Sequence, residues 1–390
     1  MEKAKVADFM KKYTMILALV LVIIFFSVST GGKLLMPQNI ANLIAQNAYV
    51  YVLATGMLLA ILTGGNIDLS VGSVVCFVGA IGAVAMESWH WGGIAAVALV
   101  LAAGLAIGGF QAYWIAYVRV PPFIVTLAGM FVFRGLSNVI LGGKTVSLKN
   151  AGFIKVFGGG ANCYFPDLFG SGKVNILTLI VGILICAFYI VSVFRSRSKK
   201  IKKGYETGSF VSEIIKMVVI CAVVLYVTYK LAMYKGIPTA LVWVSVIVVI
   251  YAYITSKTTT GRYFYAVGGN EKATKLSGIN TNKVYFLAYI NMGLLAAIAG
   301  LLTIARMSSA QPTYGQNYEM DAIGSCFIGG ASAYGGVGTV PGVIIGATLM
   351  GIINLGMSIM GVDANWQKVV KGVVLLMAVI FDVVTKKQKD

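Results

Sequence analysis

Charged residues are scarce in this chain of 390 residues, where Asp, Glu, Lys and Arg together make up only 11%. Soluble domains typically contain about 25% of these residues. Hydrophobic residues reach 58% instead, and the mean hydropathy is +0.87. This composition excludes an ordinary soluble domain and predicts a polytopic membrane protein.

Residues that serve catalysis or metal binding are also few. The single histidine, His90, lies between Trp89 and Trp91, a triplet typical of the aromatic belt at a membrane surface. The five cysteines show neither metal-binding spacing nor a disulfide framework. The stretch GGKT at 142–145 lacks the earlier glycine of a phosphate-binding loop, because Asn138 stands at that position. We therefore predict a chain that is not an enzyme and that binds no metal or cofactor itself.

Long apolar segments recur along the whole chain, and crossing a bilayer takes about 17–25 residues. Eleven segments qualify or nearly qualify: 14–30, 47–62, 71–86, 94–118, 123–141, 174–194, 214–234, 239–255, 284–305, 340–360 and 369–384. A twelfth segment, 321–333, is shorter and rich in glycine, which predicts a half-span or a re-entrant piece. The sequence thus predicts an all-α polytopic membrane protein with about 10–12 transmembrane helices over residues 14–385.

Lysines and arginines outnumber acidic residues and give a net charge of +18. Their four main groups fall on one side if twelve segments cross, whereas Lys144, Lys149, Lys155 and Lys173 fall in the longest loop on the other side. The positive-inside rule places the side with the four main groups in the cytoplasm. It predicts a cytoplasmic N-terminus at 1–13, a basic cytoplasmic loop at 195–213, a second cytoplasmic loop at 256–283 and a cytoplasmic tail at 386–390. The loop at 142–173 would be external. The charge is therefore explained by topology and by contact with the lipid bilayer, and it predicts no nucleic-acid binding.

The stretch 63–73, TGGNIDLSVGS, interrupts two of the apolar segments. Gly64 and Gly65 tolerate backbone angles that end a helix, whereas Asn66, Asp68 and Ser70 are residue types that begin one. One interpretation is a tight turn in which Asp68 caps the next helix. The other is a broken helix that lines a transport pathway, since an ionisable residue at membrane depth needs a partner, water or a cap.

A second glycine-rich stretch, IGGASAYGGVG at 328–338, also separates two apolar segments. No strand precedes it, so we interpret it as a break between helices and not as a nucleotide-binding loop. Its candidate pathway residues are Gly329, Gly330, Ser332, Gly335, Gly336 and Gly338.

The predicted loop at 256–283 contains the signals of a short helix. Asn270 is a good N-cap, Glu271 suits the positive helix start, and Gly278 suits the position after the helix end. Ala273 and Leu276 would give this helix an apolar edge. A helix of about two turns does not persist alone in water, so it needs a protein surface to pack against. The alternative is an ordinary capped helix within a loop.

These stretches resemble a known family. Glu271, Ala273 and Gly278 resemble the E-A-A…G coupling motif of the permeases of binding-protein-dependent ABC importers. The stretches 64–73 and 328–338 resemble the ILTGGxIDLSVGS and IGGTSxxGGxG signatures of the ribose, galactose and xylose branch. The closing stretches 354–361 and 366–382 resemble its NxGxxxxG and WQxxVKG…D patterns. The basic block and the two added spans after Phe194 are similar to the longer xylose and multiple-sugar permeases.

The resemblance implies a homodimeric permease with the type II fold of the vitamin B12 importer class, in the cell membrane of a bacterium. Two ATPase subunits, which would hold ATP and Mg, would dock on the helix at 270–278. A binding protein would deliver a monosaccharide, such as xylose, galactose, arabinose or glucose, from outside. One alternative is a related importer for nucleosides or branched-chain amino acids. Another is an ion-coupled sugar carrier, against which the small number of charged residues within the apolar segments argues.

Overall fold

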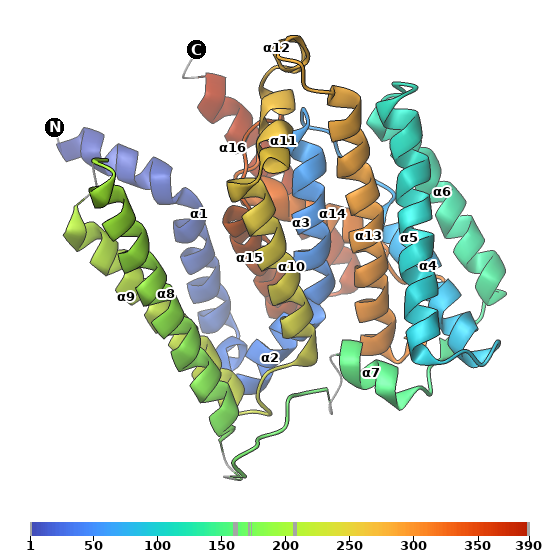
Figure 1. Cartoon of the computed structure of the whole chain (residues 1–390). Helices are drawn as coiled ribbons and strands as arrows, with labels where there is room; N and C mark the ends of the chain where they lie inside the picture. The colour runs from blue at the N-terminus through green and yellow to red at the C-terminus, as the bar shows by residue number, and fades with distance from the viewer. Residues whose placement is uncertain (1, 159–162, 171, 173, 206–208, 388–390) are drawn as a thin grey trace.

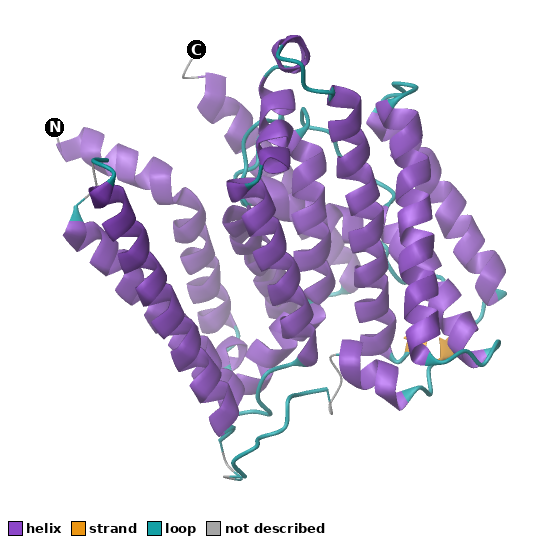
Figure 2. Ribbon diagram, viewed as in Figure 1, coloured by secondary structure: helices purple, strands orange, loops and turns teal. Residues whose placement is uncertain are grey.

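The computed structural model describes residues 2–158, 163–170, 172, 174–205 and 209–387, and most of these residues are helical (Figures 1 and 2). Long helices run side by side between two ends of the molecule. The N-terminal segment, the C-terminal segment and the short helix α12 (Glu271–Leu276) lie at the upper end in Figure 1, and helix α7 (Ala151–Phe157) lies at the lower end. We call these the α12 end and the α7 end.

The remaining helices, in chain order, are α1 (Glu2–Ser29), the 3-10 helix η1 (Lys33–Leu35), α2 (Pro37–Gln46), α3 (Ala48–Leu62), α4 (Val71–Glu87), α5 (Gly93–Ala116), α6 (Pro122–Leu141), α8 (Ile176–Lys202), α9 (Phe210–Ala232), α10 (Thr239–Lys257), α11 (Thr259–Gly269), α13 (Thr281–Met307), α14 (Tyr318–Ile328), α15 (Val340–Ile359) and α16 (Ala364–Lys387). Two short strands, β1 (Val146–Ser147) and β2 (Ser309–Ala310), pair antiparallel.

The helix lengths confirm an all-α polytopic membrane protein. Among the described residues, seven helices are each long and apolar enough to cross a bilayer, namely α5, α6, α8, α9, α10, α13 and α15. The pair α2 and α3, bent by 43° at Asn47, forms an eighth. The predicted count of ten is therefore reached if two of the shorter or more polar helices α1, α4, α14 and α16 also cross, and twelve if all four do.

Helices α3 and α13 form the centre of the bundle, because nearly every residue of α3 is buried. Helix α13 packs closely on α5 through glycines. A Cβ atom at Gly293 would lie only 2.3 Å from the carbonyl oxygen of Gly104, so only glycine allows this distance between the two backbones. Helices α8 and α9 instead pack mainly on each other, and Figure 1 shows this pair at the edge of the bundle.

Two predicted loops are more helical than the sequence analysis assumed. The basic block at 195–202 is the last part of α8, and α9 already begins at Phe210, so the predicted loop at 195–213 is reduced to 203–209, of which 206–208 lie outside the described residues. Lysines at a helix C-terminus favour this extension because they interact well with the helix dipole. In the same way, most of 256–283 belongs to α11, α12 and the start of α13, and α16 runs to Lys387, with 388–390 outside the described part.

Candidate functional site

The short helix α12 has the caps that its sequence predicts. The backbone N–H of Ala273 donates a hydrogen bond of 2.9 Å to the Asn270 side chain, and Glu271 is the first helical residue. Ser277 ends the helix, and Gly278 follows with φ of 82°, a conformation that disfavours other residues. The Leu276 side chain is 89% exposed at the α12 end of the molecule. Leu276 and the exposed Ala273 thus form a small apolar surface that no other described residue covers.

Glu271 is joined to the turn between α5 and α6 by Arg119. Nη1 of Arg119 donates a hydrogen bond of 2.8 Å to Oε1 of Glu271, and the Tyr285 hydroxyl donates one of 3.1 Å to Oε2. The guanidinium also lies 5.1 Å from the centre of the Tyr285 ring and donates to Thr281 and Asn282. Partial burial opposes ionisation, but the hydrogen bonds from Arg119 and Tyr285 and the Arg119 charge hold the pKa of Glu271 below its usual value.

The two predicted helix breaks meet each other at the α12 end. A Cβ atom at Gly65 would lie 1.9 Å from the carbonyl oxygen of Ala333, and one at Gly335 would lie 2.4 Å from Cα of Gly64. All three glycines have positive φ angles, so other residues would be strained there as well as too large. The stretches 63–70 and 329–339 thus touch backbone to backbone, and we call their contact the glycine junction.

Helix α11, which leads directly into α12, closes the glycine junction from a third side. The N–H of Gly336 donates a hydrogen bond of 3.1 Å to the carbonyl oxygen of Leu62, the last residue of α3. A Cβ atom at Gly268 in α11 would lie 1.8 Å from that same oxygen. The Tyr265 hydroxyl, also in α11, donates to the carbonyl oxygen of Gly338 at 2.8 Å. The junction therefore connects α11 and α12 with both breaks.

The first break places Asp68 inside the bundle. The carboxylate is 2% exposed and accepts hydrogen bonds from the N–H and the hydroxyl of Ser70 at 2.8 and 2.7 Å. Ser70 is the residue that precedes α4, so Asp68 fixes the turn at the helix start without occupying the N-cap position itself. The N–H of Asp68 lies 3.4 Å from the sulfur of Met57 in α3. Met57 lies five residues before the end of α3, about 7.5 Å along the helix. Helix α4 therefore begins inside the bundle and not at its α12 end.

Helix α14, which precedes the second break, is like α4 a short helix that begins inside the bundle. The loop before it is held by Arg134 of α6, whose Nη1 donates to the carbonyl oxygens of Pro312 and Tyr314 at 3.0 and 2.6 Å. A Cβ atom at Gly72, near the start of α4, would lie 2.1 Å from the Gly315 carbonyl oxygen. The starts of the two short helices α4 and α14 are thus neighbours in the bundle.

The other residues of the second predicted stretch end α14 and shape the turn that follows. Gly330 has φ of 83°, and the Gly329 backbone lies against Gly342 of α15. Ser332 is buried, and its hydroxyl accepts a hydrogen bond of 3.1 Å from the N–H of Tyr334. The half-span predicted at 321–333 is confirmed in kind, although the helix itself covers Tyr318–Ile328.

Three charged residues of these contacts were not assigned a role from the sequence. Arg119 lies near the end of one apolar segment and Arg134 lies within another, and Lys371 entered only as the lysine of the WQxxVKG…D pattern. Lys371 lies 2.9 Å from the buried carboxylate of Asp321. A charge that interrupts an apolar segment was the available signal, since such residues are expensive in a membrane unless they are paired.

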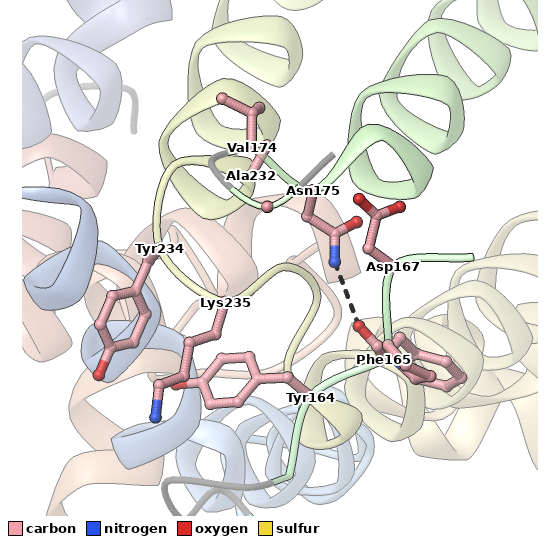
Figure 3. A pocket seen from close by; sticks show the side chains of 10 residues that line it. Tyr164, Phe165, Asp167, Val174, Asn175, Ala232, Tyr234 and Lys235 are labelled. Carbon is pink, nitrogen blue, oxygen red and sulfur yellow. Dashed lines mark hydrogen bonds between the residues drawn. The ribbon is translucent and has the colours of Figure 1, made fainter. Parts of the chain in front are cut away.

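A separate cavity of about 360 Å³ opens at the α7 end, where the residues before α8 meet those after α9 (Figure 3). The Lys235 ammonium lies 5.9 and 5.6 Å from the ring centres of Tyr164 and Tyr234. Burial, followed by the nearby Tyr234 and Cys163, raises the pKa of Tyr164 to about 12. Asn175 spans the wall with a hydrogen bond of 3.2 Å to the Phe165 carbonyl oxygen. This cavity is remote in the fold from α12 and the glycine junction.

Comparisons with known proteins identify relatives of this chain among membrane permeases. Residues 39–379 match the family described as the permease component of the branched-chain amino acid transport system. The xylose transport system permease protein of Haemophilus influenzae is 38% identical over 96% of this chain and 97% of the relative, and that of Escherichia coli is 34% identical over 96% and 92%. The ribose import permease protein of Escherichia coli is 35% identical over 97% and 95%.

No solved structure matches the chain. The family match nevertheless covers most of the sequence, and the relatives align along almost their full length. This chain therefore belongs to the family of transport permeases whose members include the xylose and ribose permeases of bacteria.

Proposed function

We propose that this chain is the permease subunit of an ATP-driven ABC importer and that it translocates a monosaccharide. The relatives named above are a xylose and a ribose permease, and they align over nearly the whole chain. The proposed monosaccharide is a pentose, as the names of these relatives state, or a hexose. In this proposal the chain forms the pathway and hydrolyses no ATP, because partner subunits hold ATP and Mg.

The observation that carries the mechanism is the position of α12. This helix presents Leu276 outward and is joined through α11 to the glycine junction. An ATPase subunit that docks on α12 would therefore push on both helix breaks at once. The two short helices α4 and α14 would tilt, and the pathway would open alternately to the two sides. ATP binding and hydrolysis in the partner subunits would supply the energy, and the different affinity of these subunits for the two states would shift the permease between them.

The assembly would contain two copies of this chain, two ATPase domains and a sugar-binding protein on the α7 end. Both termini and α12 would lie in the cytoplasm of a bacterial cell, which is the side that the basic groups favour. Broken helices that begin inside the bundle are compatible with the type II fold of the vitamin B12 importer class.

Two other substrate classes remain as alternatives within the same mechanism, namely branched-chain amino acids, which the family description names, and nucleosides. An ion-coupled sugar carrier is a third alternative, and the buried aspartates Asp68 and Asp321 with the half-buried Lys371 are the residues that would serve it.

Reconstitution tests the proposal directly. The purified chain is placed in proteoliposomes with the ATPase subunits and the binding protein, and uptake of labelled xylose, ribose, leucine and uridine is measured with and without ATP. We expect ATP-dependent uptake of a pentose or hexose, and no ATP hydrolysis by the chain alone. Uptake that follows an ion gradient without ATPase subunits would refute the ABC mechanism, and ATP-driven uptake of leucine or uridine alone would refute the sugar.

A further inference from the structure

Helix α16 holds the short helix α14 at both ends through polar side chains. At the start of α14, Nζ of Lys371 lies 2.9 and 3.2 Å from the two carboxylate oxygens of Asp321, which is 1% exposed. Beyond the end of α14, the carboxylate of Asp382 accepts a hydrogen bond of 3.2 Å from the N–H of Ala333. The Tyr49 hydroxyl of α3 donates to Asp321 as well, at 2.8 Å.

The contacts from α16 come from one face of that helix. Lys371 and Asp382 are eleven residues apart, which is three helical turns, and Leu375 lies one turn from Lys371. A Cβ atom at Gly324, midway along α14, would lie 3.9 Å from Cδ1 of Leu375, an ordinary van der Waals distance. A continuous stripe of α16 therefore follows α14 over its whole length.

The ion pair is largely shielded, because the side chain of Asp321 is 1% exposed and that of Lys371 is 18% exposed. Lys371 is seven residues after the start of α16, about 10 Å along its axis. Two charges in such a place are costly to bury, and hydrophobic residues of similar size would often stabilise the fold as well or better. A contribution to stability therefore explains the pair poorly. A charged pair can instead fix α14 in one position on α16.

We propose that α14 and α16 move as one rigid body during transport, and that Lys371 and Asp382 are the positioning residues that join them. This inference rests on the proposed function, because the movement is the one that α12 delivers to the glycine junction. Ala333, the partner of Asp382, is part of that junction through its contact with Gly65. A displacement of the junction would therefore move α14 and α16 together. Helix α16 would then move with the residues of the second break.

Cross-linking tests the rigid body. In a variant in which the five native cysteines are replaced, Gly324→Cys and Leu375→Cys are joined by a short thiol-specific reagent that a reductant can remove. Uptake in the full assembly is measured before cross-linking, after it and after reduction, with each single-cysteine variant as a control. We expect cross-linked protein to keep uptake within about twofold of the reduced protein. Loss of uptake on cross-linking with recovery on reduction would show that α14 slides along α16, and would overturn the proposal.

A second measurement separates positioning from stability. Lys371→Met removes the cation, whereas Lys368→Met changes an exposed lysine one turn away on the same helix. With the first variant we expect the ATP hydrolysed per imported sugar to rise about tenfold, since losing one partner of a buried pair is costly in every state that needs it. The control should stay within twofold. A variant that only lowers the amount of folded protein, with an unchanged ratio of ATP to sugar, would assign the pair to stability and overturn the proposal. A wild-type assembly without ATP-driven sugar uptake would instead refute the proposed function.

Discussion

Arg119 and Glu271 are 152 positions apart in the chain, and their charged groups lie 2.8 Å from each other. Arg119 belongs to the turn between α5 and α6, and Glu271 begins α12, so the pair joins the helix proposed to receive the ATPase subunit to a second part of the bundle. Both side chains are more than one third exposed, at 42% and 36%. Such a pair contributes little to stability, about 0.2–1 kcal/mol, and its value lies in where it fixes α12.

We expect Arg119→Ala to lower sugar uptake by about three- to tenfold while membrane insertion and protein level stay normal, because α12 loses its link to the turn. The double variant Arg119→Glu with Glu271→Arg should recover part of the uptake lost by Arg119→Glu alone, since the opposite charges again face each other. Arg262→Ala, an exposed arginine on α11, is the control. Equal uptake in all of these variants would show that the pair takes no part in coupling.

Gly268 and Gly269 are adjacent residues of α11 with very different surroundings. A Cβ atom at Gly268 would lie 1.8 Å from the Leu62 carbonyl oxygen, whereas one at Gly269 would meet nothing within 4 Å. Gly268→Ala must therefore force α11 away from the glycine junction, and we expect at least a tenfold loss of uptake. Gly269→Ala should leave uptake within about twofold, because alanine favours a helix over glycine. ATPase retention on the membrane should survive in both variants, which separates the junction from docking. Similar uptake in the two variants would argue against transmission through this contact.

The sequence predicted the features that depend on nearby residues. Asn270, Glu271 and Gly278 obey capping rules that act within one turn, so the ends of α12 were found without the structure. Gly65 and Gly335 were recognised as separate breaks. That they touch depends on how distant helices pack, and local rules carry no information about such packing.

The partners of Arg119 and Lys371 were missed for the same reason, since each lies far away in the chain. The basic block at 195–202 was taken for a loop because it is charged, although lysine and arginine are good helix formers and the preceding apolar helix simply continues. The exposure of Leu276 was likewise not predictable, because an apolar residue on a short helix is as often packed against its own chain.

Leu276 is the side chain of α12 that offers the most apolar contact to a partner, since it is 89% exposed. We expect Leu276→Glu to remove at least 90% of the ATPase subunit from isolated membranes, because burying an unpaired carboxylate in a protein interface is costly. Leu168→Glu, a change at a leucine that is 75% exposed near the α7 end, should leave retention unchanged. Co-purification at matched protein level measures both. Full retention with Leu276→Glu would show that the ATPase subunit binds elsewhere.

Asp68 allows the helix-break role to be separated from a charge role. Asp68→Asn keeps an oxygen that accepts the hydrogen bonds from Ser70, whereas Asp68→Leu leaves the buried N–H and hydroxyl of Ser70 without this partner. A buried donor without a partner costs about 1–3 kcal/mol, enough to shift or loosen the start of α4. We therefore expect Asp68→Asn to keep at least half of the sugar uptake and Asp68→Leu to lose about nine tenths of it, measured with ATP at equal amounts of folded protein. Complete loss in both variants would show that the negative charge itself is required, and would favour the ion-coupled carrier over the ABC importer.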